Sequence, residues 1–210
     1  GDQSLVLELG AGTGELSNAI GLILGPAGPV TAVPVDRTSG ALQQVTPLLY
    51  LDLAEEYAQE VLVDVVKRGK VVHVHLSCPS DTLDQLRKAK RLTSKGRQSP
   101  QPRALRDADH LLGLPSRDDG EPEGLVPHEV ARLRNDNQVI HFYQSMIKHC
   151  EELGIGWTLE ASATSWLWYF PWVAEFEAKR DVLRMETDLC AWHGPAKQQI
   201  AIIGRLPDLE

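Results

Sequence analysis

Short apolar runs of strand length alternate along this chain with longer segments in which apolar residues recur at helical spacing. Strands are predicted at Leu5–Leu9, Val30–Val35, Leu48–Leu51, Lys70–Leu76, Ile155–Leu159, Val182–Met185 and Gln199–Ile203. Helices are predicted at Glu15–Leu24, Ala54–Arg68 and His128–Leu153. Such alternation is typical of an α/β protein with a mostly parallel sheet. The last two strands follow one another closely, so we expect them to pair antiparallel and close the sheet.

One long segment departs from this pattern. Between about residues 92 and 127, prolines and glycines are frequent and large apolar residues are few. A long irregular segment within a compact domain is usually either functional or disordered. The 210 residues fit one domain with one core, so the sequence predicts a single domain over residues 1–210 that carries this segment as an insertion. The aromatic cluster Trp166–Pro171 is predicted to pack in the core, with base stacking as the alternative.

The composition is that of an ordinary soluble protein, with 42% hydrophobic and 24% charged residues. No apolar run approaches the roughly 20 residues that span a bilayer, so no membrane association is expected. Three widely spaced cysteines, Cys78, Cys150 and Cys190, favour a reducing, intracellular compartment over a disulfide framework. Because the first predicted strand begins almost at once, we expect the chain to be part of a larger multidomain protein.

The charge is distributed unevenly along the chain. A net charge of −8 argues against indiscriminate nucleic-acid binding. However, one segment contains basic residues and no acidic ones, namely Arg87, Lys88, Lys90, Arg91, Lys95, Arg97, Arg103 and Arg106. This segment is either a loop that contacts DNA phosphates or a solvated insertion without a partner. Composition alone does not decide between the two.

The strongest local motif follows the first predicted strand. Glu8, Gly10, Gly12 and Gly14 form E-x-G-x-G-x-G, the pattern of an S-adenosylmethionine (AdoMet) loop. Glycines allow a sharp strand-to-helix turn and let a cofactor approach the backbone closely. The dinucleotide fingerprint fails because Glu15 stands where its third glycine should be, and no Gly-Lys-Ser/Thr of a P-loop follows. The alternative is a glycine-rich turn that holds no ligand.

Two aspartates end the second and third predicted strands. Asp36 is placed to accept hydrogen bonds from the ribose hydroxyls of a nucleoside cofactor, and Asp52 to meet an adenine amino group. Both occupy carboxyl ends of strands, where ligands bind in open α/β sheets. The alternative for each is a turn or helix-cap residue, and Asp52 precedes a helix in the manner of a cap.

The segment His75–Thr82, HLSCPSDT, and the segments after it resemble the cytosine-5 DNA methyltransferase family. In that family a strand leads into Pro-Pro-Cys, and a basic loop, a long helix and Glu-Asn-Pro follow. The resemblance covers nearly the whole chain in order, although the motifs are degraded. It implies a Rossmann-like class I methyltransferase fold, with a seven-stranded, mostly parallel sheet, an antiparallel C-terminal strand and helices on both faces. It also implies AdoMet as cofactor and cytosine in DNA as substrate.

The same resemblance assigns roles to individual residues. The glycine loop and Asp36 match the family's cofactor site. Ser80 stands where the family has its nucleophilic cysteine, and Cys78-Pro79 stands for its Pro-Pro. Glu160 matches the glutamate of Glu-Asn-Pro, whose other two residues are not retained. Near the C-terminus, Lys197 is the basic residue of a segment that resembles the family's Gly-x-x-(Arg/Lys).

Ser80 is the departure with the largest consequence. Methylation at carbon five of cytosine needs a thiolate, which a serine hydroxyl does not readily replace. Cys78, two residues away, is an alternative nucleophile. Three functions therefore remain open: a degenerate cytosine-5 methyltransferase-like domain, a non-catalytic module that binds cofactor or nucleic acid, and a methyltransferase for another substrate. The spacing of His73, His75 and Cys78 is too weak a signal to predict a metal.

Overall fold

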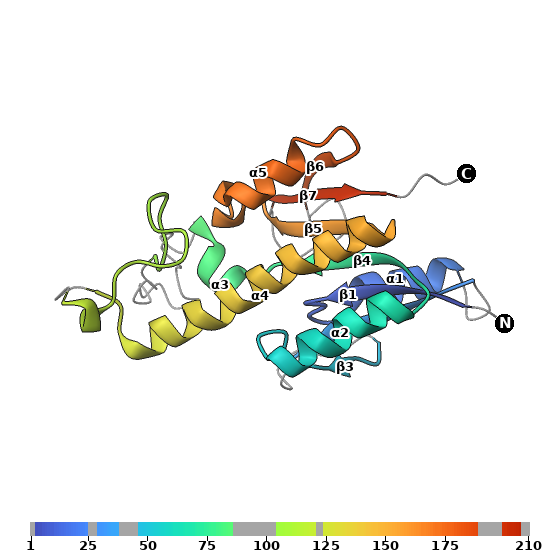
Figure 1. Cartoon of the computed structure of the whole chain (residues 1–210), viewed down its shortest axis with the longest axis horizontal. Coiled ribbons are helices and arrows are strands. Elements are labelled where there is room, and N and C mark those ends of the chain that lie inside the picture. The colour runs from blue at the N-terminus through green and yellow to red at the C-terminus, as the bar shows by residue number, and fades with distance from the viewer. Residues whose placement is uncertain are drawn as a thin grey trace, which may run out of the picture.

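The computed structural model describes residues 3–24, 29–37, 46–85, 104–120, 124–188 and 199–206, except for the side chains of residues 80 and 81. One sheet of seven strands runs through it, in the order β3-β2-β1-β4-β5-β7-β6 (Figure 1). The strands are β1 (Ser4–Leu9), β2 (Val30–Asp36), β3 (Leu49–Tyr50), β4 (Val71–Ser77), β5 (Gly156–Ser162), β6 (Leu183–Asp188) and β7 (Gln199–Arg205). The first five are parallel, and β7 is antiparallel to both of its neighbours. The predicted Rossmann-like fold, with a seven-stranded, mostly parallel sheet and an antiparallel C-terminal strand, is confirmed.

Helices cover both faces of this sheet. They are α1 (Glu15–Leu24), α2 (Glu56–Arg68), α3 (Ser80–Leu83), α4 (Pro127–Leu153) and α5 (Pro171–Glu177), with short 3-10 turns η2 (Arg117–Asp119) and η3 (Trp166–Tyr169). In Figure 1, α2 and α4 lie in front of the sheet and α1 lies behind it. Across the described ranges, no helix combines the length and the apolar character that crossing a membrane requires.

The main core lies between the sheet and helices α2, α4 and α5. The long helix α4 begins with a proline at its first turn and ends at Gly154, whose φ of 69° is left-handed. Its residues Tyr143, Met146 and Ile147 are fully buried. Trp157 of β5 is also fully buried, and its ring centroid lies 5.6 Å from that of Phe176 in α5. Most of the aromatic residues after β5 pack against this core, as predicted.

The described part of the predicted insertion, residues 104–120 and 124–127, packs on α4. A second small core forms there from Leu105, Leu125 and Leu133, with Leu114 against it. The described half of the insertion is therefore irregular in backbone but anchored by buried apolar side chains.

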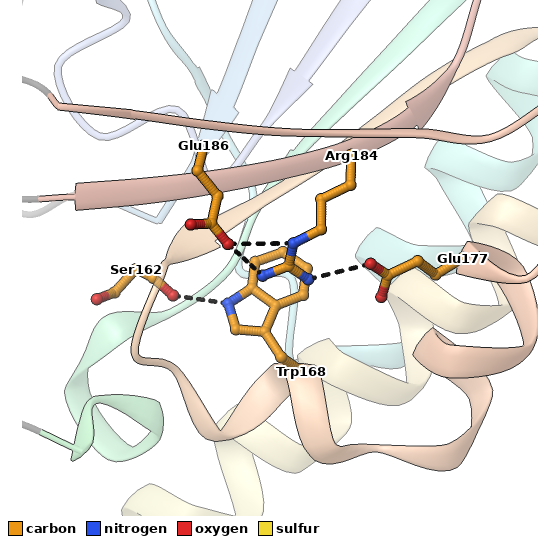
Figure 2. A network of polar contacts seen from close by, with 5 residues as sticks. All are labelled: Ser162, Trp168, Glu177, Arg184 and Glu186. Carbon is orange, nitrogen blue, oxygen red and sulfur yellow. Dashed lines mark hydrogen bonds and ion pairs between the residues drawn. The ribbon is translucent and has the colours of Figure 1, made fainter.

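The loop after β5 is fixed by a polar network, which Figure 2 shows. The guanidinium of Arg184 in β6 lies 4.7 Å from the ring centroid of Trp168 and is paired with Glu186 at 2.8 Å and Glu177 at 3.4 Å. The indole nitrogen of Trp168 donates to the carbonyl oxygen of Ser162 at 2.7 Å. The network ties η3 and α5 to the sheet and so holds the carboxyl end of β5 in place.

Candidate functional site

A cavity of about 370 Å³ opens at the carboxyl ends of the parallel strands. Of the predicted site residues, Gly10, Asp36, Asp52 and Cys78 line it. Helix α4 forms its far wall with Asn135, Asp136, Val139 and Tyr143. The volume falls within the range of small-molecule sites in proteins. Strand ends from β1 to β4 and one helix thus meet around a single pocket.

The glycine loop turns as its sequence predicts. Gly10, Gly12 and Gly14 have φ values of 75°, 58° and 78°, which are left-handed and favour glycine. A Cβ atom on Gly10 would lie 2.4 Å from the carbonyl oxygen of Ser77 and 2.9 Å from the hydroxyl of Tyr143. A Cβ on Gly12 would meet nothing within 4 Å. The first glycine is thus required by the packing of the protein itself, while the second borders open space.

Glu8 is placed to hold this loop in position. Its side chain is buried, with the residue 4% exposed, and its Oε2 accepts a hydrogen bond of 2.8 Å from the backbone nitrogen of Ser17 in the first turn of α1. A carboxylate at a helix N-terminus also interacts favourably with the helix dipole. Glu8 does not belong to the described lining of the cavity; its observed contact supports the loop, and its contact with a cofactor stays a prediction.

Asp36 connects the end of β2 to the glycine loop. Its Oδ2 accepts from the backbone nitrogen of Gly12 at 2.7 Å, and its Oδ1 accepts from that of Arg37 at 2.6 Å. A carboxylate can accept about four hydrogen bonds, so capacity remains for a ligand.

Asp52 has the predicted turn role and also lies at the cavity, while its contact with an adenine stays a prediction. Its Oδ1 accepts from the backbone nitrogen of Ala54 at 3.0 Å, which shapes the turn into α2, while the residue also lines the cavity.

Cys78 is poorly suited to be a nucleophile. Burial raises the pKa of its thiol, and the negative charges of Asp136 and Glu160 raise that pKa further. A reactive cysteine needs the opposite, a positive environment that lowers its pKa. The alternative in which Cys78 replaces the missing nucleophile is therefore not supported. Ser80 begins α3, but its side chain lies outside the described part of the chain.

Glu160 lies near the carboxyl end of β5 and is paired in register with Ser77. Its Oε2 is 3.4 Å from Nε2 of His75, and its side chain is 26% exposed. The other ring nitrogen of His75, Nδ1, lies 2.9 Å from the hydroxyl of Thr158, which in turn lies 3.0 Å from Nε2 of His73. The alternating histidines of β4 were the sequence feature that indicated these contacts.

In the described ranges, no group of three or more metal-binding side chains is present.

Arg106 was predicted to belong to a basic surface, and this prediction is wrong. It is 0% exposed, and its guanidinium donates to the hydroxyl of Thr82, to the carbonyl of Leu111 and, at 2.7 Å, to Oδ1 of Asn137. It is therefore not available to a phosphate. The other predicted nucleic-acid contacts lie outside the described residues: Arg87, Lys88, Arg91, Arg97, Arg103 and Lys197.

The wall formed by α4 was not predicted. Asp136, Val139 and Tyr143 are spaced at helical intervals, so they share one face. Asp136 is buried and its Oδ2 accepts from the hydroxyl of Thr82 at 2.6 Å, while the hydroxyl of Tyr143 donates to the carbonyl of Ser77 at 3.0 Å. A charged residue within the apolar stripe of a long helix is the sequence feature that could have indicated this wall of the cavity.

No family model and no curated protein matches this chain. Among solved structures, it is similar to an Entamoeba histolytica methyltransferase, EhMeth, at 12% identity and a TM-score of 0.46, over 98% of this chain and 54% of that one. It is also similar to a short chain dehydrogenase family protein from Francisella tularensis, at 13% identity and a TM-score of 0.40, over 82% of this chain and 59% of that one. The chain thus spans little more than half the length of these proteins.

Proposed function

We propose that this chain binds AdoMet in the cavity, as a methyltransferase-fold domain of the cytosine-5 DNA methyltransferase type that has lost the nucleophile. The observation that carries the proposal is the hydrogen bond that the backbone nitrogen of Gly12 donates to the carboxylate of Asp36. It makes the acidic strand end and the glycine turn one unit at the carboxyl edge of the sheet, where nucleoside cofactors bind in such folds.

The donor set fits this cofactor. Asp36 would hold the ribose hydroxyls, Asp52 would meet the adenine amino group, and the loop at Gly10 would face the remainder of the molecule. Among the described lining residues are three carboxylates, those of Asp36, Asp52 and Asp136, and one guanidinium, that of Arg37. This balance favours a ligand with cationic groups over one with phosphates. When bound, AdoMet supplies a methyl group on a positively charged sulfur.

The residues at the end of β4 argue against thiolate chemistry. Ser80 has no thiol, and the raised pKa keeps the thiol of Cys78 neutral at pH 7. A second candidate function is therefore methyl transfer to an acceptor that needs a base instead of a covalent nucleophile. The contact between Glu160 and His75 favours it, because a carboxylate beside an imidazole can accept a proton.

Contact with DNA remains part of the proposal, through the basic segment between Arg87 and Arg103 and through Lys197. Arg106 is excluded from that surface by its burial. Sequence-independent phosphate contacts would make binding weaken as salt concentration rises.

Isothermal titration of AdoMet and of NAD⁺ into the protein tests the cofactor. We expect AdoMet to bind and Asp36→Asn to weaken it roughly tenfold to a hundredfold, the effect of losing charge-assisted hydrogen bonds. The matched control is Asp64→Asn, which removes one exposed carboxylate on α2 that does not belong to the described cavity lining. Absence of binding at millimolar AdoMet, or equal binding of NAD⁺, would overturn the proposal.

Transfer of a labelled methyl group from AdoMet distinguishes the two candidate functions. The degenerate-enzyme proposal expects no transfer to DNA by the parent chain and a gain in Ser80→Cys. Transfer by the parent that is insensitive to changes at Ser80 and Cys78 would instead support the second candidate.

A further inference from the structure

Four polar side chains form a continuous chain across β4 and β5, outside the described cavity lining. These contacts run from His73 through Thr158 to His75 and end at Glu160. In the parallel register His75 is opposite Thr158. Alternate residues of a strand share one face, so all four side chains lie on the same side of the sheet.

The hydrogen positions along this chain follow from what each group can donate. Nε2 of His75 lies 3.4 Å from Oε2 of Glu160, within ion-pair distance, and an ionised carboxylate there only accepts, so this contact favours a proton on Nε2. In a neutral ring Nδ1 then has none, and the hydroxyl of Thr158 must donate to it. The same hydroxyl oxygen can then accept only from Nε2 of His73, which must also be protonated. With His75 neutral and Glu160 ionised, one assignment satisfies every contact.

The environment of His73 agrees with this assignment. Burial, with a smaller contribution from His75, lowers the pKa of His73 to about 4. Its ring is therefore neutral at pH 7 and has one hydrogen to donate. Glu8, which is beside His75 in the register of β1, directs its Oε2 to the backbone of Ser17 instead. Within the described part of the chain, the carboxylate that contacts His75 is thus that of Glu160.

We propose that His75 is the positioning residue of Glu160. Its imidazole holds the carboxylate at the carboxyl end of β5, and Thr158 with His73 fixes which ring nitrogen of His75 carries the proton. This role rests on the second candidate function, methyl transfer to an acceptor whose proton Glu160 accepts.

The placement of Glu160 suits that role. Its backbone carbonyl accepts from the backbone nitrogen of Cys78 at 2.9 Å, so the strand end is fixed beside the loop that leads to Ser80. Its side chain is partly exposed, whereas His75 behind it is buried. An acceptor could therefore reach the carboxylate but not the imidazole. Burying a polar group such as the hydroxyl of Thr158 costs free energy unless the group is hydrogen-bonded. An apolar residue at this position would fill the same space without that cost, so the hydroxyl is consistent with a role in orienting His75.

Long-range ¹H–¹⁵N correlation spectra of the histidine rings in the ¹⁵N-labelled full chain test the proposal. We expect His75 to have a protonated Nε2 and an unprotonated Nδ1. Thr158→Val keeps the side-chain shape but removes the hydroxyl, and His75 should then lose this single tautomer. Thr158→Ser should restore it. The control is Thr31→Val, the same change on β2, which should leave the His75 signals unaltered.

Two results would overturn the proposal: a proton on Nδ1 of His75 in the parent chain, or unchanged His75 signals in Thr158→Val. If Thr158→Val does not fold, the parent spectrum and Thr158→Ser still decide. The readout needs neither AdoMet nor an acceptor. A failed AdoMet titration would therefore remove the proposed function and leave this measurement intact.

Discussion

At the scale of single residues, His73 is a buried imidazole whose folded environment opposes its charge. Its pKa is lowered to about 4 by burial and by His75, from an ordinary value of 6.5. Between these two pH values the unfolded chain binds more protons than the folded one, so stability rises with pH in that window. Well above pH 6.5 His73 is neutral in both states, and its effect on stability vanishes.

This difference predicts a specific acid sensitivity. On lowering the pH from 7 to 5, His73 should cost the protein about 2 kcal/mol in the free energy of unfolding. Urea unfolding of the parent chain and of His73→Gln at several pH values measures it. The variant should lose stability less steeply between pH 6.5 and 4. Parallel curves for the two proteins would show that His73 is protonated as easily in the folded state as in the unfolded one.

The residues that the sequence could predict are those whose role is local. Gly10 follows from the steric needs of a strand-to-helix turn, and Asp36 from its place at a strand end. Arg106 and Cys78 could not be assigned in this way, because their roles depend on burial and on charges from a distant helix. A run of basic residues has the same sequence whether its side chains face solvent or, like Arg106, face Thr82 and Asn137 in the interior.

At the scale of elements, the described half of the insertion is clamped to the wall of the cavity. The hydroxyl of Thr82 in α3 accepts from Arg106 at 2.9 Å and donates to Asp136 of α4 at 2.6 Å. Burial lowers the pKa of Arg106 to about 10 and Asp136 opposes that effect, so the guanidinium stays charged. Three segments of the chain therefore meet at one buried hydroxyl.

We expect Arg106→Met to destabilise the protein by roughly 3–5 kcal/mol, the cost of leaving a buried charge without its partner. Arg117→Met, in the same segment but exposed, should cost no more than about 0.5 kcal/mol. Urea unfolding of both variants gives the two values. Equal and small effects would mean that Arg106 does not bind the insertion to α3 and α4.

Helix prediction succeeded where periodicity was strong and failed where the helices were short. Helix α1 matches its predicted bounds, and α4 begins one residue earlier than predicted. Helix α5 has only seven residues within an aromatic run, so no helical repeat could develop to indicate it. The wall of the cavity was missed for another reason: Asn135 and Asp136 become site residues only when α4 crosses the strand ends.

At the scale of the whole molecule, the parallel sheet determines the position of the site. The turns that follow β1, β2, β3 and β4 all emerge at one edge because these strands run in the same direction. The antiparallel pair β6–β7 lies at one end of the strand order, with β5 between it and β4. A ligand in the cavity would therefore contact segments that are far apart in sequence and leave the C-terminal strands untouched.

Hydrogen exchange measured by mass spectrometry can follow this pattern. Saturating AdoMet should slow exchange together in the glycine loop, residues 10–14, whose Gly10 lines the cavity, and in the segments 36–37, 52–53, 77–79 and 135–143, which contain the other lining residues. Residues 183–188 should keep their rate, because β6 lies beyond β7 and β5 from the site. At the same AdoMet concentration Asp36→Asn should show weaker protection in all of these segments, since they share one ligand. Protection confined to β6, or spread evenly over the chain, would place the ligand elsewhere or indicate general stabilisation without a site.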